Sequence, residues 1–155
     1  NLYHDQTFIL CSSARTNPAA AALAEALVAA AGAQPLWLGP LQHDRLVALV
    51  SHLPYFAAAA LMAEAAAAAR TGNHVWQVSA GGFRDTTRLA GSDPLMLRDI
   101  SETNRDEILA ALRAYARRLQ EIITLLERGD REALLDWLAA RQREHTQLRA
   151  AKQRS

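Results

Sequence analysis

Two short segments of the sequence combine residue types that could bind a ligand. The first runs from a His-Asp pair to a Ser-His-Leu-Pro-Tyr stretch and contains the candidates His43, Asp44, Ser51, His52 and Tyr55. Within it, Pro54 removes one backbone donor and is predicted to bend the helix. A simpler interpretation stays open: His43-Asp44 marks a helix start, where a negative charge is favourable, and Ser51 and His52 satisfy the backbone carbonyl that the bend frees.

The second segment, Gly81–Arg88, has the sequence Gly-Gly-Phe-Arg-Asp-Thr-Thr-Arg. Tandem glycines allow backbone conformations that other residues avoid, and they let a ligand approach the backbone closely. If the segment is helical from Phe83, Arg84 and Arg88 share a face at a helix start. Backbone donors and a guanidinium there can form a carboxylate or phosphate site. A solvated charged turn is the alternative.

The first forty residues, which precede both segments, are predicted to form a β-α-β unit. Thr7–Cys11 is a short apolar run of strand type, and Pro35–Leu38 is a second one. Between them, Thr16 or Asn17 can cap a helix that has Pro18 at its first position. Two strands are too few for a stable domain, so we expect this unit to belong to a larger sheet.

From residue 41 onward the sequence contains only helix signals. Apolar residues around Pro54 repeat at three- and four-residue intervals, as on a buried helical stripe: Leu46, Val47, Leu49, Val50, Leu53 and Phe56. The spacing also predicts a long amphipathic helix from Glu102 to Glu127, which Gly129 closes, and a last helix capped by Asp130. The apolar face of the long helix is too extensive for a small monomer to cover, which indicates a homodimer.

Composition argues against several classes of protein. The formal net charge is +1 without a basic stripe, so we expect no nucleic-acid partner. Cys11 is the only cysteine and no two histidines stand four residues apart, so we expect no metal. The longest candidate for a membrane span, around Ala57–Ala69, contains Glu64 and is mostly alanine, too weakly apolar to cross a bilayer, so we expect no membrane span. The start lacks a signal-peptide pattern, which favours a cytoplasmic protein.

Taken together, the ordered motifs resemble the prephenate/arogenate dehydrogenase family, and within it the arogenate dehydrogenases of cyanobacterial type. The set comprises His43-Asp44, the Ser-His-Leu-Pro stretch, the Gly-Gly-Phe-Arg-Asp-Thr-Thr-Arg segment, Ser92-Asp93-Pro94 and Asn104. Its order and spacing match the family from about Leu2 to Leu138. The resemblance implies a mainly α fold. Residues 41–155 would form an all-helical, intertwined dimerisation domain like the C-terminal domain of 6-phosphogluconate dehydrogenase. Residues 1–40 would be the β-α-β end of a Rossmann-type nucleotide-binding domain.

The resemblance also implies a substrate-binding set that consists of Arg88, Ser51, His52, Tyr55, Gly81, Gly82 and Asp85. The arginine would bind a substrate carboxylate, which suits its bidentate geometry, and the Ser-His pair would line the cleft between the domains. The glycines and the aspartate would lie near the substrate, partly across the dimer interface. Two positions depart from the family. Many prephenate-using members have a second histidine at Tyr55, which favours arogenate here, and Ala80 replaces a usual glycine. Packing of Tyr55 with Phe56 in the core is the alternative.

The implied activity is the NAD- or NADP-dependent oxidative decarboxylation of arogenate or prephenate in tyrosine biosynthesis. The family's Gly-rich fingerprint and its catalytic histidine lie upstream of the matching region, and no GxGxxG occurs in the 155 residues. We therefore expect a fragment of the enzyme, with no catalytic residue, no assignable cofactor-binding residue and no activity alone. The alternative from another class is a non-catalytic helical dimerisation or ligand-sensing module.

Overall fold

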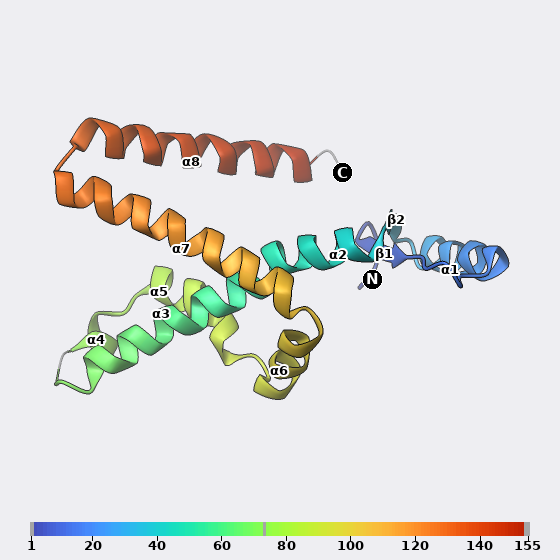
Figure 1. Cartoon of the computed structure of the whole chain (residues 1–155), viewed down its shortest axis with the longest axis horizontal. Coiled ribbons are helices and arrows are strands. Elements are labelled where there is room, and N and C mark those ends of the chain that lie inside the picture. The colour runs from blue at the N-terminus through green and yellow to red at the C-terminus, as the bar shows by residue number, and fades with distance from the viewer. Residues whose placement is uncertain (1, 73, 154–155) are drawn as a thin grey trace. The chain divides into compact units, whose positions relative to one another are not determined.

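The computed structural model describes residues 2–72 and 74–153, and over these it is mainly α-helical (Figure 1). The elements are β1 (Thr7–Cys11), α1 (Pro18–Ala30), β2 (Gln34–Leu38), α2 (Pro40–Val47), the π-helix η1 (Ala48–His52), α3 (Leu53–Ala69), α4 (Val75–Val78), α5 (Gly81–Thr87), the 3-10 helix η2 (Arg88–Gly91), α6 (Pro94–Thr103), α7 (Arg105–Arg128) and α8 (Arg131–Lys152). The expected fold class is confirmed. The outermost positions of the two expected domains, residues 1 and 154–155, lie outside the described residues.

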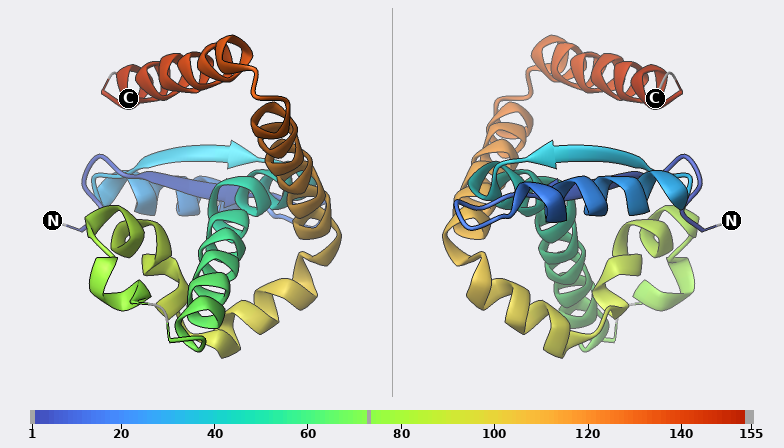
Figure 2. Two further views of the ribbon diagram at one scale, coloured as in Figure 1. Left: turned by 90° about the vertical axis from the view of Figure 1, so that its left-hand side faces the viewer. Right: turned by 90° about the vertical axis from the view of Figure 1, so that its right-hand side faces the viewer.

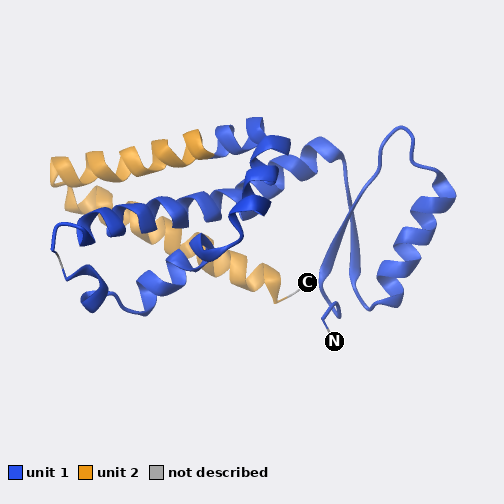
Figure 3. Cartoon of the chain, turned by 90° about the horizontal axis from the view of Figure 1, so that it is seen from below, with its two compact units in different colours: residues 1–111 blue, residues 112–155 orange. Residues whose placement is uncertain are grey.

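The chain divides into two compact units, residues 1–111 and 112–155, so that α7 begins in the first unit and ends in the second (Figure 3). The first unit contains every residue that the sequence analysis singled out as a ligand contact. The second contains the rest of α7 and all of α8.

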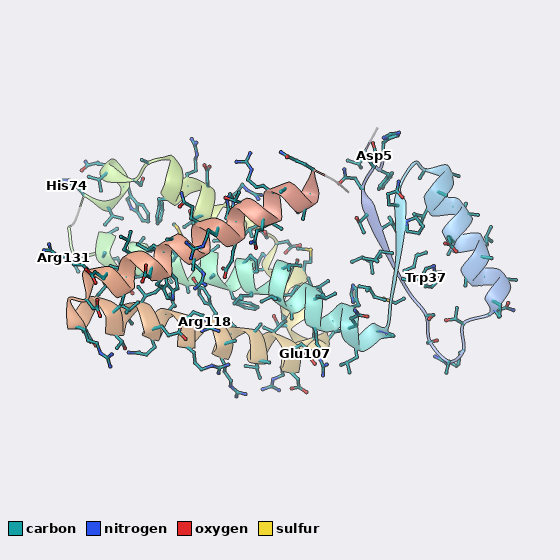
Figure 4. All side chains as sticks on the ribbon, turned by 90° about the horizontal axis from the view of Figure 1, so that it is seen from above. Asp5, Trp37, His74, Glu107, Arg118 and Arg131 are labelled. Carbon is teal, nitrogen blue, oxygen red and sulfur yellow. The ribbon has the colours of Figure 1, made fainter. Side chains whose placement is uncertain are left out.

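Residues 7–38 form the predicted β-α-β unit. β1 and β2 pair in parallel, with Thr7 opposite Gln34, and α1 connects them (Figure 2). Of the two capping candidates, Asn17 is the N-cap, because its side chain accepts a hydrogen bond from the N–H of Ala19. Large apolar side chains on both strands stay exposed, as expected of part of a larger sheet: Phe8, Ile9, Leu36 and Trp37, the last labelled in Figure 4.

A π-helical turn joins α2 to α3, because Pro54 interrupts the hydrogen-bond ladder. Proline has no N–H, so the carbonyl of Val50 loses its usual donor four residues on. The ladder widens, and the N–H of Leu53 donates to the carbonyl of Ala48, five residues earlier. The interruption that the sequence predicts therefore takes the form of a widened turn.

The apolar stripe around this turn is less buried than its spacing predicts. Leu49 is 55% exposed and Val50 is 69% exposed, whereas Ala48 and His52 are buried. The π-turn explains part of the difference, since an extra residue in one turn changes which side chains face inward. Neighbouring large apolar side chains that are exposed are typical of an interface.

The helical run Pro40–Ala69 is, within the described ranges, the one helix that is long and apolar enough to cross a membrane by length and composition. The mean hydropathy of its most apolar window is 1.8. The sequence-based expectation considered only the alanine-rich part, Ala57–Ala69. Continuation of the helix through the π-turn adds the leucines and valines before Pro54, which raises the hydropathy. Helices of soluble proteins that other protein surfaces cover meet the same criteria.

Asn104 separates α6 from α7, so the long helix starts at Arg105 and not at Glu102 as predicted. The backbone of Asn104, with φ −122° and ψ 33°, leaves the helical region and ends α6. α6 itself begins at Pro94, which directly follows Asp93 of the motif set. The side chain of Asp93 caps it by accepting a hydrogen bond from the N–H of Leu95.

In the second unit, a short turn at Gly129 and Asp130 joins α7 to α8. Gly129 has φ +64°, and Asp130 caps α8 by accepting from the N–H of Ala133, as the sequence predicts. α8 then continues to Lys152. Large apolar side chains on the two helices remain exposed: Tyr115, Leu119, Ile123, Leu126, Leu135 and Leu138. Two helices alone therefore leave their apolar faces uncovered.

Gly129→Ala is expected to lower the free energy of unfolding by about 1–2 kcal/mol, because a residue with a Cβ is strained in the left-handed region. A Cβ at Gly129 would meet nothing within 4 Å, so strain and not a clash is responsible. Urea denaturation at one fixed protein concentration measures the change. The control is Gly82→Ala, in α5 and facing open space, which should leave stability unchanged or slightly raised. Equal losses in the two variants contradict this explanation.

Candidate functional site

The residues of the first motif that lie in and after the π-turn differ in burial. His52 is only 9% exposed, whereas its neighbour Ser51 is exposed and Tyr55, in the first turn of α3, is half-buried. The ring of Tyr55 lies edge-on to that of Phe56, with ring centroids 5.4 Å apart. The alternative that Tyr55 packs with Phe56 is therefore observed in part. Half-burial still leaves some of Tyr55 accessible to a ligand.

Four polar residues, His43, Asp44, His52 and Asn104, form what we call the histidine cluster. The side-chain Nδ2 of Asn104 donates to the backbone carbonyl of Asp44 at 2.8 Å and lies 3.4 Å from Nδ1 of His52. Nδ1 of His43 lies 3.0 Å from Oδ1 of Asp44. Burial lowers the pKa of His52 below its ordinary value, His43 lowers it further, and Asp44 opposes both effects. The His52 ring is therefore uncharged near neutral pH.

Asn104 is the residue whose importance sequence reasoning missed. From the sequence it is only one member of the motif set, yet its side chain joins segments 60 residues apart. A second link runs beside it, where Nε of Arg45 lies 3.3 Å from Oε1 of Glu107, labelled in Figure 4. The predicted helix start at Glu102 placed Asn104 inside the helix. The signal that could have corrected this is that asparagine favours helix ends over helix interiors, and the acidic residues Asp106 and Glu107, typical of a first turn, follow it.

The Gly81–Arg88 segment is helical from its first residue. Arg88 lies at its C-terminal end, where α5 ends and η2 begins. Arg88 therefore does not lie with Arg84 at a helix start, which was the condition for an anion site that both arginines share. The N–H of Arg84 already donates to the carbonyl of Ala80. A helix C-terminus carries partial negative charge, which favours arginine side chains over an anion. Anion binding at Arg88 would therefore rest on its guanidinium group.

Neither Gly81 nor Gly82 needs a backbone conformation that other residues avoid. Both lie in α5, and neither has a positive φ. A Cβ at Gly82 would meet nothing within 4 Å, and one at Gly81 would meet only Nη2 of Arg84 at 3.9 Å. Of the two reasons for tandem glycines, conformational freedom is thus excluded, and close approach by a ligand remains.

The side chain of Arg88 is exposed, and it forms neither a hydrogen bond nor an ion pair with any residue in 2–72 or 74–153. Arg84 instead contacts the adjacent Asp85, with Nε 3.6 Å from Oδ1 and both side chains exposed. α5 and η2 both pack against α3, the helix that carries Tyr55 and directly follows His52. The two motifs therefore lie around one helix, although no hydrogen bond or ion pair among the described residues joins them. An unpaired guanidinium can bind a carboxylate through two hydrogen bonds.

A hollow of about 440 Å³ adjoins the glycine segment. Its wall combines apolar, aromatic and cationic side chains, from Met62, Trp76, Ser79, Ala80, Gly81, Phe83, Arg84 and Thr87. The rings of Trp76 and Phe83 lie 6.4 Å apart, centroid to centroid. Among the predicted substrate-binding residues only Gly81 contributes to this wall, so the hollow and the Arg88 guanidinium are separate features.

The residues present do not fit a dinucleotide or a metal ion. The turn between β1 and α1, residues 12–17, contains no glycine, so it lacks the loop that lets a pyrophosphate approach a helix N-terminus. In the described part of the chain, no group of three or more His, Cys, Asp or Glu side chains could hold a metal. We therefore assign no cofactor or metal contact to this chain.

Comparison with known proteins places these features in a family. The family model described as prephenate dehydrogenase, dimerization domain, matches residues 39–140, more than half of the chain. Prephenate dehydrogenase of Bacillus subtilis is 32% identical over 133 residues, which are 86% of this chain and 36% of that protein. Cyclohexadienyl dehydrogenase of Zymomonas mobilis is 29% identical over 136 residues, 87% of this chain and 46% of that protein. The chain thus spans less than half of the length of these relatives.

Solved structures agree with the sequence comparisons. Prephenate dehydrogenase from A. aeolicus, in complex with hydroxyphenyl propionate and NAD+, has a TM-score of 0.90 and 28% identity. The match covers 96% of this chain and 52% of that one. Synechocystis arogenate dehydrogenase has a TM-score of 0.82 and 25% identity, over 95% of this chain and 54% of that one. The chain therefore belongs to the prephenate dehydrogenase family, whose dimerization domain it contains.

Proposed function

We propose that the protein containing this chain is an arogenate or prephenate dehydrogenase of tyrosine biosynthesis. The observation that carries the proposal is the family match over residues 39–140, which agrees with the order and spacing of the motifs. Such an enzyme transfers hydride from a cyclohexadienyl acid to NAD or NADP while the ring carboxylate leaves as carbon dioxide and the ring becomes aromatic. This chain would supply the dimer interface and the substrate-carboxylate site.

Arg88 is the residue that we propose to bind a substrate carboxylate. It is exposed and unpaired within the described ranges, and a guanidinium matches a carboxylate with two parallel hydrogen bonds. The other proposed substrate contacts come from the π-turn, α3 and the start of α5: Ser51, His52, Tyr55, Gly81, Gly82 and Asp85. Their role is to hold and orient the ring, which lowers the barrier by removing unproductive arrangements.

The cofactor is proposed to be NAD or NADP. The complex of the A. aeolicus relative contains NAD+, which supports a nicotinamide dinucleotide without deciding between the two. Because the described residues do not fit a dinucleotide site, we assign no step of hydride transfer to this chain. Its contribution to the reaction is substrate binding.

The partner is proposed to be a second copy of the same chain. Exposed apolar residues around the π-turn and along α7 and α8 are explained if another subunit covers them. The apolar helical run Pro40–Ala69 would likewise be covered by protein contacts rather than by a membrane. We propose that the enzyme is cytoplasmic. The family match begins at residue 39, which supports the proposed domain boundary between residues 40 and 41.

Activity of the complete protein tests the proposal. The purified protein should reduce NAD+ or NADP+ when arogenate or prephenate is added, as followed by the absorbance of the reduced cofactor. The 155-residue chain alone, measured beside it, should show no activity. A complete, folded protein that oxidises neither substrate contradicts the proposal and favours a non-catalytic dimerisation or ligand-sensing module.

Tyr55→His in the complete protein should raise the use of prephenate relative to arogenate. Prephenate carries a keto acid side chain, whereas arogenate carries an amino acid with an added positive charge. A histidine, when protonated, attracts the keto acid and disfavours the ammonium, while a phenol is uncharged near pH 7. The measurement is the ratio of kcat/KM for the two substrates in both proteins. Tyr55→Phe is the control, because it removes the hydroxyl without adding a charge. A wild-type preference for prephenate, or an unchanged ratio, contradicts the role of Tyr55.

A further inference from the structure

The buried ring of His52 has two nitrogens, and the side chain of Asn104 lies close to one of them, Nδ1. The backbone carbonyl of Asp44 can only accept a hydrogen bond, so the side-chain atom of Asn104 that lies 2.8 Å from it must be the amide nitrogen, Nδ2. This contact fixes the orientation of the amide. The second hydrogen on Nδ2 is then available to Nδ1 of His52, 3.4 Å away.

We infer that Asn104 is a positioning residue that holds His52 as the tautomer with its proton on Nε2, so that Nε2–H is the group offered to the ligand. An amide N–H facing Nδ1 requires that Nδ1 accept, and a neutral imidazole with an accepting Nδ1 carries its hydrogen on Nε2. Burial of the ring favours this neutral form. The role in ligand binding rests on the proposed function, whereas the tautomer does not.

Two helical features bring the pair together. The π-turn ends at His52 and buries its ring, and the break between α6 and α7 frees Asn104 from helical geometry. Because these elements are distant in sequence, the contact depends on the tertiary fold of the first unit. A purely structural role, in which Asn104 only ties α2 to the α6–α7 junction, would affect stability but would not set the tautomer.

Nitrogen NMR of the chain labelled at histidine distinguishes protonated from unprotonated ring nitrogens, at about pH 8, where a free imidazole is neutral. The His52 signals are assigned by their loss in His52→Gln. We expect Nδ1 of His52 to be unprotonated in the wild type. Asn104→Asp should invert the tautomer, because its carboxylate accepts from Nδ1–H, and should raise the pKa of His52. Asn104→Ala should give a mixture of both tautomers.

Thr103→Ala is the matched control, since the Thr103 hydroxyl donates only to carbonyls of its own helix. It should leave the His52 signals unchanged. Circular dichroism shows which variants fold, and if Asn104→Asp does not fold, the Asn104→Ala spectrum decides. A wild-type His52 with its proton on Nδ1, or a folded Asn104→Asp with unchanged His52 signals, overturns the inference.

In the complete protein, Asn104→Asp should lower kcat/KM about tenfold with a change in its pH profile, because Nε2 becomes an acceptor. Thr103→Ala should not change either. A protein that shows the expected spectra but oxidises neither substrate refutes the proposed function and leaves the tautomer assignment intact. Inverted signals with unchanged kcat/KM and pH profile refute the role of Nε2–H in ligand binding.

Discussion

Replacing Arg88 by alanine in the complete protein should lower kcat/KM about 10- to 150-fold with little effect on folding. A hydrogen bond to a charged group contributes roughly 1.5–3 kcal/mol, which corresponds to that range. Folding should be spared because the Arg88 side chain is exposed and forms no hydrogen bond or ion pair with the residues described. Steady-state kinetics with the better substrate measure the loss, and thermal unfolding of both proteins measures the stability.

Two further variants make the Arg88 experiment specific. Arg88→Lys keeps the charge but loses the planar pair of donors, so its loss should lie between those of wild type and Arg88→Ala. Arg98→Ala removes another exposed arginine, which is paired with the adjacent Asp99, and should leave kcat/KM unchanged within about twofold. Unchanged activity and KM in Arg88→Ala would show that Arg88 is only a surface residue.

Introducing charge on the apolar face of α7 should convert the protein from a dimer to a monomer. We expect the wild type to be dimeric at micromolar concentration, with an interface of about 2,000 Å² or more. Leu119 and Ile123 are exposed and lie four residues apart, so they share one face of the helix. The double variant Leu119→Arg, Ile123→Arg would place two unpaired charges inside the interface, which is strongly unfavourable. Sedimentation equilibrium measures the association state.

Ala114→Arg is the matched control for this experiment, because Ala114 is exposed in the same helix, on the side away from Leu119. It adds the same charged group and should leave the dimer intact. A wild type that sediments as a monomer at micromolar concentration contradicts the dimer proposal. Dimers in all three proteins would show that the α7 face is not the interface.

Local sequence determined much of this fold, because its signals act over a few residues. The strand Thr7–Cys11, a helix cap at Thr16 or Asn17, the Asp130 cap and the helix stop at Gly129 could each be predicted from residue type and spacing. The ordered motifs also indicated the family, which the comparisons confirmed. The roles assigned to the substrate-binding residues and the boundary at residue 40 remain predictions.

Only the tertiary structure decided how the site is built. Pro54 predicts an interruption in the helical hydrogen bonds. Whether the helix kinks or widens into a π-turn depends on what packs around it. In this structure it widens, and His52, at the end of the π-turn, is buried. The sequence left the Gly81–Arg88 segment open between a helix from Phe83 and a charged turn. The structure has a helix that begins two residues earlier, at Gly81, and ends before Arg88. Asn104 reaches Asp44 and His52 across 60 and 52 residues, and no local pattern encodes a contact between segments so far apart in sequence.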